Sequence, residues 1–204
     1  MTATAARGLL MALALAAGAF PAGAADQRGD PDWPCVQRKV PELSLGQMWP
    51  GPVPEGDWRD DPAITRLAPV MAARRTSLDE VKALAEDYAA GIPEAERPER
   101  MARLYAAVLD RIDSDRGAVI GGISRYARKQ AGLAEKVKAE EADLAALKAA
   151  PEPDLDRVEE AQDNLNWDIR VYRDRSQSLT YVCETPTLLE QRAFAIARVL
   201  SGGA

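Results

Sequence analysis

Two apolar patterns that mirror each other across Pro151 constrain the fold of this chain more than any other feature. Before Pro151, apolar residues recur at alternating steps of three and four residues as far as Leu147, and the same spacing runs from Leu155 to Cys183. If the chain folds back at Pro151, apolar residues meet in pairs whose residue numbers always add to 302. The pairs are Leu147 with Leu155, Leu144 with Val158, Val137 with Leu165, Leu133 with Ile169, and Ile123 with Leu179. Matched seams are typical of antiparallel coiled coils, so we expect a helical hairpin over about 117–184 with its turn at 149–154.

Polar residues of the two seams also coincide in this register. The polar pairs are Glu140 with Gln162, Gln130 with Tyr172, and Tyr126 with Ser176. Polar layers of this kind fix the register of a coiled coil at a cost in stability. At 1.5 Å per residue, the predicted arm is about 48 Å long. Two helices of this length bury little surface, so the base of the hairpin requires a helical body to anchor it.

The remaining helices of that body are predicted from capping signals and apolar spacing. A capping box at Ser77–Glu80 begins a helix that ends near Ile92, after a shorter predicted helix over 63–74. A further helix begins near Pro98, and its apolar pattern shifts phase near Arg116, beside Gly121-Gly122. This stutter predicts a bend or break at 116–122. A second capping box at 187–190 follows Pro186 and predicts a separate C-terminal helix that ends at 201–203.

Residues 25–62 have a different composition from the rest of the chain. They contain seven of the prolines, which exclude a long helix and favour an extended path. Three of the four tryptophans lie here: Trp33, Trp49 and Trp58. We interpret the segment as a strap whose tryptophans anchor it on the helical body. In the alternative interpretation, some of these side chains bind a partner, since aromatic residues are enriched at interface hot spots.

The first residues are typical of a cleaved export signal. Arg7 precedes an apolar run at 9–20, then Pro21 and the small residues 22–24, and the run is too short for a bilayer span, which needs about 20 residues. We therefore expect residues 1–24 to be removed and the chain to be periplasmic. In an oxidising compartment, the two cysteines, Cys35 and Cys183, are expected to form a disulfide. Closing so long a loop contributes about 4–5 kcal/mol in the chain-entropy treatment.

These features together predict an all-α protein. It has a helical-bundle body, a protruding antiparallel coiled-coil hairpin and an extended Pro/Trp-rich N-terminal segment. The predicted divisions are the signal peptide at 1–24, the extended segment at 25–62 and the helical domain at 63–204.

The composition excludes several classes of chemistry. The chain has no histidine, which rules out Ser-His-Asp and Cys-His catalysis and histidine-bound metals. Asp110, Asp113 and Asp115 do not have the spacing of a calcium-binding loop, so we assign them to a helix surface. We predict no catalytic residue, cofactor or metal ligand. The net charge of −6 argues against nucleic acid as a partner, and no stretch after the signal is apolar enough to be a transmembrane span.

Charge is unevenly distributed along the predicted arm. Residues 135–163, around the turn, contain ten acids and four bases, whereas 116–130 contain four bases and no acid. Solvated helix faces explain this pattern most simply. The functional interpretation is that the acidic tip attracts a basic partner, or that the basic half faces an anionic surface. The candidate partner-binding residues are Glu152, Asp154, Asp156, Glu159 and Glu160, together with Trp33, Trp49 and Trp58.

The sequence therefore favours a non-enzymatic periplasmic interaction protein, such as an adaptor, a chaperone-like factor or an accessory subunit. Its partner is expected to be another envelope protein, and a homodimer through the hairpin is a further possibility. The alternative is a small-ligand-binding or sensor bundle with its site between helices. A carboxylate-dependent hydrolase is the third hypothesis, and it requires a pocket that holds two facing carboxylates.

Overall fold

The computed structural model describes residues 30–202, and within this range the regular structure is entirely helical. The helices are α1 (Leu45–Met48), η1 (Trp58–Asp60), α2 (Pro62–Ala72), α3 (Leu78–Ala90), η2 (Glu94–Glu96), α4 (Arg97–Lys148) and α5 (Leu155–Leu200). This confirms the predicted all-α class. The expected signal peptide lies outside the described residues.

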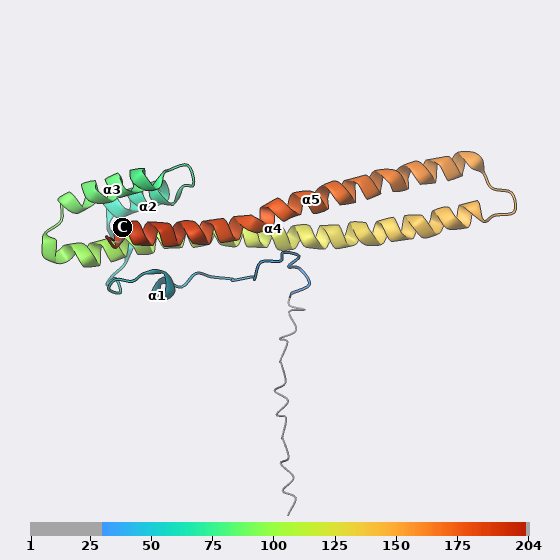
Figure 1. The fold of residues 1–204 in the computed structure, drawn as a ribbon. Helices are drawn as coiled ribbons and strands as arrows, with labels where there is room; N and C mark the ends of the chain where they lie inside the picture. The colour runs from blue at the N-terminus through green and yellow to red at the C-terminus, as the bar shows by residue number, and fades with distance from the viewer. Residues whose placement is uncertain (1–29, 203–204) are drawn as a thin grey trace, which may run out of the picture.

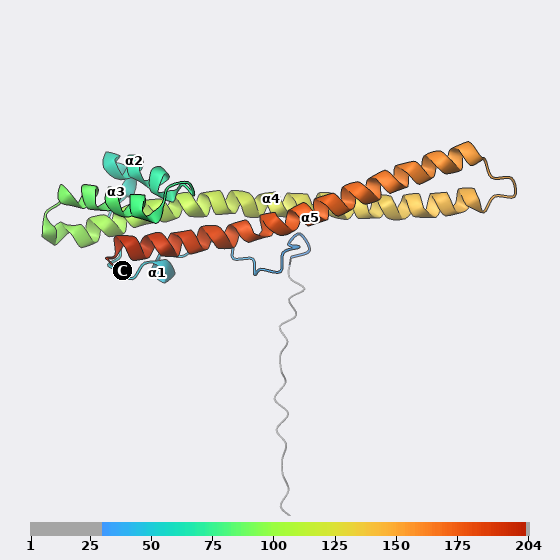
Figure 2. The ribbon, with the colours of Figure 1, turned by 45° about the horizontal axis from the view of Figure 1, so that its top comes forward.

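Helices α4 and α5 run side by side for most of their length and form the predicted hairpin (Figures 1 and 2). Contacts across the seam confirm the register. The side-chain amide of Gln130 donates to the carbonyl of Tyr172 at 3.1 Å and to the hydroxyl of Ser176 at 3.0 Å. The hydroxyl of Tyr126 donates to the carbonyl of Arg175 at 3.3 Å. Buried apolar residues continue along the hairpin beyond the body: Ile120, Ile123, Leu144, Leu165 and Cys183. The predicted pattern fails at the tip, where Leu155, the expected partner of Leu147, is 76% exposed.

The body lies at the end of the hairpin opposite the turn, where α2 and α3 pack on α4 and α5 (Figure 1). Its core comes from one face of each of these helices and from the end of the N-terminal segment. The fully buried apolar side chains include Ile64, Met71, Val81, Leu104, Tyr105, Val108, Ile112 and Ile196. The body therefore supplies the anchored base that a two-helix arm needs, and residues 117–184 (hereafter the arm) project from it.

The predicted break at 116–122 is wrong, because α4 is one uninterrupted helix of 52 residues. The phase shift has a different cause. Up to Ile112 the buried residues of α4 belong to the body core, whereas Arg116 is buried against the strap, and Ile120 and Ile123 are buried farther along the arm. One continuous helix thus packs in the body core with its first part and along α5 with its second part. Gly121 and Gly122 lie within this helix.

The separate C-terminal helix is also wrong, because α5 continues through Pro186 to Leu200. A proline inside a helix removes one backbone hydrogen bond and crowds the preceding turn. Here Pro186 is itself buried, and the residues after it pack into the body core: Leu189, Ala193, Ile196, Ala197 and Leu200. We attribute the continuity of the helix to this packing, which outweighs the local preference to stop.

Arg192 fastens the end of α2 to α5. Its guanidinium donates to the carbonyls of Ala72 at 2.9 Å, Met71 at 2.6 Å and Thr76 at 2.9 Å. The last carbonyls of a helix lack partners within the helix, and a basic side chain that reaches them stabilises the helix end. Burial of this guanidinium, and then the nearby charge of Arg74, lower the pKa of Arg192.

Asp61 organises the start of α2. Its carboxylate caps the helix by accepting from the N–H groups of Ala63 at 2.8 Å and Ile64 at 3.3 Å. It also accepts from the hydroxyl of Tyr88 at 3.1 Å and pairs with Arg100 at 2.9 Å. Burial opposes ionisation of this carboxyl, but these donors outweigh burial and lower the pKa of Asp61. Burial and the adjacent carboxylate raise the pKa of Tyr88 to about 12.

Stability is therefore expected to depend on the ionisation of Asp61. Because its pKa is lowered in the folded chain, the carboxylate contributes stability above the ordinary aspartate pKa, and this contribution is lost as pH falls through the folded pKa. Asp61→Asn keeps a capping oxygen but cannot ionise. We expect the variant to be less stable than wild type by about 1–2 kcal/mol at neutral pH. Urea unfolding from about pH 7 to pH 3 should show this difference shrinking in acid, whereas a pH-independent difference would contradict the assignment.

Candidate interaction surfaces of the strap and the arm

The strap, residues 30–61, lies along one side of the hairpin from the middle of the arm to the body (Figure 1). It is mostly extended, as predicted, and includes only the short helices α1 and η1. Trp49 anchors its body end. This side chain is 8% exposed, stacks on Tyr105 with ring centroids 4.9 Å apart, and donates from Nε1 to the carbonyl of Pro52 at 3.0 Å. Trp49 thus packs within the chain and offers little surface to a partner in this state.

The other two strap tryptophans are only partly buried. Trp58 packs on the body core and has the guanidinium of Arg59 4.2 Å above its ring. Trp33 donates from Nε1 to the carbonyl of Gln37 at 2.8 Å and has the ammonium of Lys39 5.7 Å from its ring centre. Both retain accessible ring surface, so partner binding at these two positions stays a prediction.

A buried arginine on α4 holds the middle of the strap. Arg116 is 2% exposed, and its guanidinium donates to the backbone carbonyls of Val40 and of Pro41, the latter at 3.3 Å. The adjacent Asp113 is 3.4 Å from this guanidinium and accepts the N–H of Leu43 at 3.0 Å. The two charged side chains therefore bind three backbone groups of the strap: two carbonyls and one N–H. The strap has no regular secondary structure here that could satisfy these groups.

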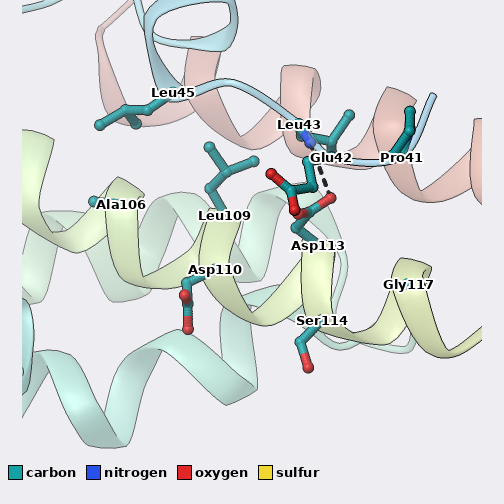
Figure 3. A pocket seen from close by; sticks show the side chains of 10 residues that line it. All are labelled: Pro41, Glu42, Leu43, Leu45, Ala106, Leu109, Asp110, Asp113, Ser114 and Gly117. Atoms are coloured by element: carbon teal, nitrogen blue, oxygen red, sulfur yellow. Dashed lines mark hydrogen bonds between the residues drawn. The ribbon is translucent and has the colours of Figure 1, made fainter.

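The carboxylate of Asp113 also lines an open cleft beside the strap. This open cleft between the strap and α4 has a volume of about 510 Å³, and Glu42, Asp110 and Asp113 contribute carboxylates to it (Figure 3). Asp113 is engaged by Arg116 and Leu43, and Asp110 lies 3.6 Å from the guanidinium of Arg59. Within residues 30–202, no three potential metal ligands cluster together. The carboxylates of Asp110 and Asp113 are thus explained by attachment of the strap.

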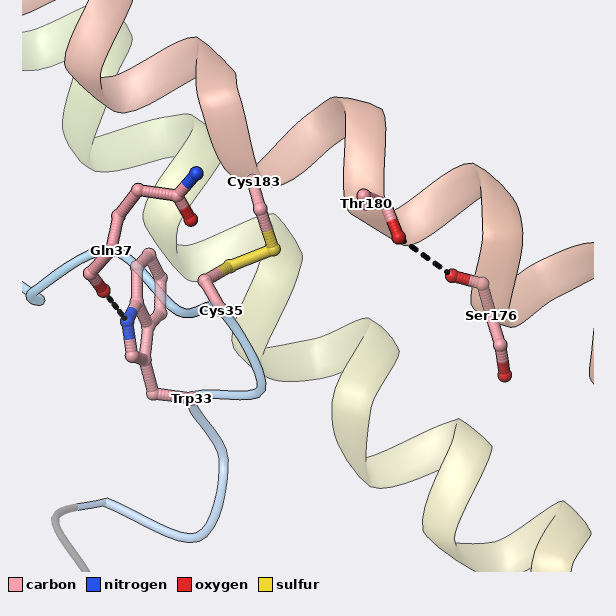
Figure 4. The surroundings of a disulfide bond; sticks show 6 residues. All are labelled: Trp33, Cys35, Gln37, Ser176, Thr180 and Cys183. Atoms are coloured by element: carbon pink, nitrogen blue, oxygen red, sulfur yellow. Dashed lines mark hydrogen bonds between the residues drawn. A yellow bond between two sulfur atoms is a disulfide. The ribbon is translucent and has the colours of Figure 1, made fainter. Parts of the chain in front are cut away.

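The disulfide fixes the other end of the strap to the arm. Cys35 and Cys183 are bonded, with their Cα atoms 5.5 Å apart (Figure 4). The bond closes a sequence separation of 148 residues, as the sequence predicts. A second cleft, of about 480 Å³, opens beside it and is lined by strap prolines, Tyr172, Leu179 and Glu184.

A charged network lies in the outer half of the arm, where α4 and α5 face each other. The ammonium of Lys136 bridges Asp168, which is 9% exposed, and Glu140 at 3.3 Å. The hydrogen bond to Asp168, and then the one to Glu140, raise the pKa of Lys136. Toward the tip, Lys148 donates to Gln162 at 2.8 Å. The predicted register places Glu140 opposite Gln162. In the structure each of these two side chains contacts a lysine: Glu140 contacts Lys136, and Gln162 contacts Lys148.

The five acidic candidates at the tip are all exposed. Asp154 caps α5 by accepting the N–H of Arg157 at 3.2 Å. Among the described residues, none of the five carboxylates forms an ion pair. Their charges are therefore unneutralised and available to a basic partner, which is consistent with the predicted role but does not test it.

An aromatic stripe on the outer face of α5 escaped the sequence analysis. Trp167, Tyr181 and Leu188 lie on the positions that recur every seven residues directly opposite the seam, with Asp174 between the first two. Trp167 is 63% exposed, Tyr181 69% and Leu188 44%. We call these three residues the outer stripe. The seven-residue spacing of these residues is present in the sequence, but the apolar seam on the same helix is the more regular pattern and accounts for the helix by itself.

Comparison with known proteins gave no relative: no family model, curated protein or solved structure matches the chain. Among residues 30–202, no helix is both long and apolar enough to cross a bilayer.

Proposed function

We propose that this chain is a periplasmic, non-enzymatic interaction protein that presents its helical arm to another envelope protein. The observation that carries the proposal is the outer stripe. Burial of a tryptophan and a tyrosine that have most of their surface in water would be favourable, and tryptophan and tyrosine are enriched at interface hot spots. The arm therefore has one face for α4 and a second face for a partner.

The charges around the stripe indicate the kind of partner. Glu160, Asp163, Asp174 and Glu184 lie on the stripe positions or one turn from them, where the exposed bases are Arg157 and Arg170. An acidic, aromatic helix face suits a helix that combines apolar residues with lysine or arginine. Two copies of the stripe aligned with Trp167 against Tyr181 would bring Asp174 against its own copy, which disfavours a homodimer in that register.

The test compares capture of envelope proteins by the immobilised full chain and by three variants. Trp167→Ala/Tyr181→Ala removes the aromatic rings of the stripe. The second variant replaces the five tip carboxylates by amides, and Asp154→Asn within it keeps the helix cap. Lys129→Ala/Lys138→Ala, two exposed changes on α4, is the matched control. We expect the stripe variant to lose binding of a specific partner by about tenfold or more, with a smaller loss for the tip variant that grows at low salt.

Two results would contradict the proposal. Capture that is unchanged in both the stripe and the tip variants would remove the arm as the binding surface. A wild-type dimer in sedimentation that becomes monomeric in the stripe variant would assign the stripe to a second copy. Circular dichroism checks that each variant keeps its helical content.

A further inference from the structure

The first ten described residues form a small closed loop, which we call the latch loop (residues 30–39). The N–H of Trp33 donates to the carbonyl of Asp30 at 2.8 Å, and its indole donates to Gln37. Lys39 forms an ion pair with Asp30, which closes the loop across its base, and its ammonium faces the ring of Trp33. Figure 4 shows Trp33 and Gln37 beside the disulfide. Most of the polar contacts of these residues are thus made within the loop.

The latch loop has few attachments to the rest of the protein. Apart from the disulfide, its one polar contact with the arm among the described residues is the ion pair of Asp32 with Arg128. The side chain of Arg128 is 55% exposed and that of Asp32 is 32% exposed, and ion pairs in such positions contribute little. Beyond Lys39 the strap has stronger attachments to the protein. Arg116 and Asp113 bind its backbone at residues 40–43, and the buried Trp49 stacks on Tyr105.

The contact between the latch loop and the arm also leaves two hydrogen-bond acceptors unsatisfied. The side-chain oxygens of Gln37 and Gln130 are buried without a donor, and both residues line the cleft beside the disulfide. The amide of Gln130 cannot simply turn over, because its nitrogen donates to Tyr172 and Ser176. Neither oxygen therefore contributes a hydrogen bond between the latch loop and the arm. Non-covalent contacts therefore hold the latch loop weakly.

We propose that the Cys35–Cys183 bond is a redox latch: a dithiol reductant opens it and releases residues 30–39 from the arm, while residues 41–61 stay in place. The boundary falls at Val40 and Pro41, whose carbonyls Arg116 holds. Release would uncover the side of the arm that includes Gln130, Tyr172 and Leu179. The proposal concerns a different face from the outer stripe and does not depend on the proposed function.

The cleft determines which sulfur is attacked. Cys35 is partly exposed, whereas Cys183 is 6% exposed and belongs to the helix seam. A donor thiolate attacks Sγ of Cys35, a mixed disulfide forms there, and the thiolate of Cys183 leaves and is protonated. The second thiol of the donor then attacks the donor sulfur of the mixed disulfide and releases Cys35 as a thiol. The protein gains two electrons and two protons, and the donor ends as its cyclic disulfide.

Two readouts on the full chain test the latch, with dithiothreitol as the dithiol. The first is tryptic cleavage after Lys39 compared with cleavage after Arg59, both on the strap. Reduction should accelerate cleavage after Lys39 by about tenfold or more and leave cleavage after Arg59 unchanged. The second is alkylation of Cys35 in Cys183→Ser, where it is the single thiol. Its rate should approach that of the chain in urea, since the loop that carries Cys35 is no longer held on the arm.

Each readout has an outcome that overturns the proposal. If Lys39 stays as resistant in the reduced chain as in the oxidised chain, and Cys35 in Cys183→Ser reacts far more slowly than in urea, the loop remains in place without the bond. If cleavage after Lys39 and after Arg59 accelerate together, the strap leaves as one unit and the boundary at Val40 is wrong. Arg128→Ala with the disulfide intact is the control, and we expect it to release nothing.

Discussion

Replacing Arg116 with methionine should lower the free energy of unfolding by about 3–5 kcal/mol, the cost of removing one partner from a buried charged network. Methionine keeps much of the volume of the side chain but none of its donors. The carbonyls of Val40 and Pro41 and the carboxylate of Asp113 would lose their shared partner inside the protein. Arg116→Lys should recover only part of the loss, because an ammonium cannot reproduce the planar fork of a guanidinium.

Urea unfolding followed by circular dichroism measures this effect, with Arg111→Met as the matched control. Arg111 lies on the same helix and pairs with Asp115 at 3.0 Å, but both side chains are about half exposed. Its replacement should cost about 0.5 kcal/mol or less. A loss below about 1 kcal/mol for Arg116→Met would mean that water replaces the guanidinium and that the strap does not depend on it.

Trp49→Ala should cost about 3–5 kcal/mol, as is usual when a large buried aromatic side chain is truncated. The substitution removes the stack on Tyr105 and leaves the carbonyl of Pro52 without the indole donor. It also detaches the strap from the body, so cleavage by trypsin after Arg59 should accelerate even with the disulfide intact. Near-ultraviolet circular dichroism should lose the signal of the stacked pair.

Trp167→Ala is the control for this experiment. The same change in residue type at an exposed helix position should alter stability by less than about 0.5 kcal/mol. Equal costs at the two positions would show either that Trp49 is not an anchor or that Trp167 is buried by self-association. Repeating the measurement over a range of protein concentrations separates these two explanations.

The hairpin could be predicted from sequence because every layer of a coiled coil repeats the same local rule. The register followed from matching two seams across Pro151, and the contact of Gln130 with Tyr172 and Ser176 confirms it. The disulfide followed from the number of cysteines and from the expected compartment. Helix starts at Asp154 and at Ser77 followed from capping residues, which act within one turn of themselves.

The errors have a common physical origin in long-range contacts that overrule local signals. A phase shift in the apolar pattern beside two glycines locally favours a break in the helix. After Ile112, however, the next buried residue of α4 is Arg116, which binds the carbonyl of Pro41, 75 residues earlier in the chain. Pro186 locally favours the end of a helix, but the residues after it pack into the body core and Cys183 before it is buried in the seam. No window of neighbouring residues contains this information. The outer stripe could not be recognised for another reason: an amphipathic helix usually has one apolar face, which the seam already accounts for, and α5 has a second one.

The continuity of α4 and α5 has a mechanical consequence. The two helices that build the body core are the same two that reach the tip, with no linker or hinge segment between them among the described residues. A protein bound at the tip would therefore be held at a fixed distance from the body, about 50 Å for 32 residues of helix at 1.5 Å each. Force applied at the tip would pass directly into the interior of the body, so the arm acts as a rigid spacer of set length and direction.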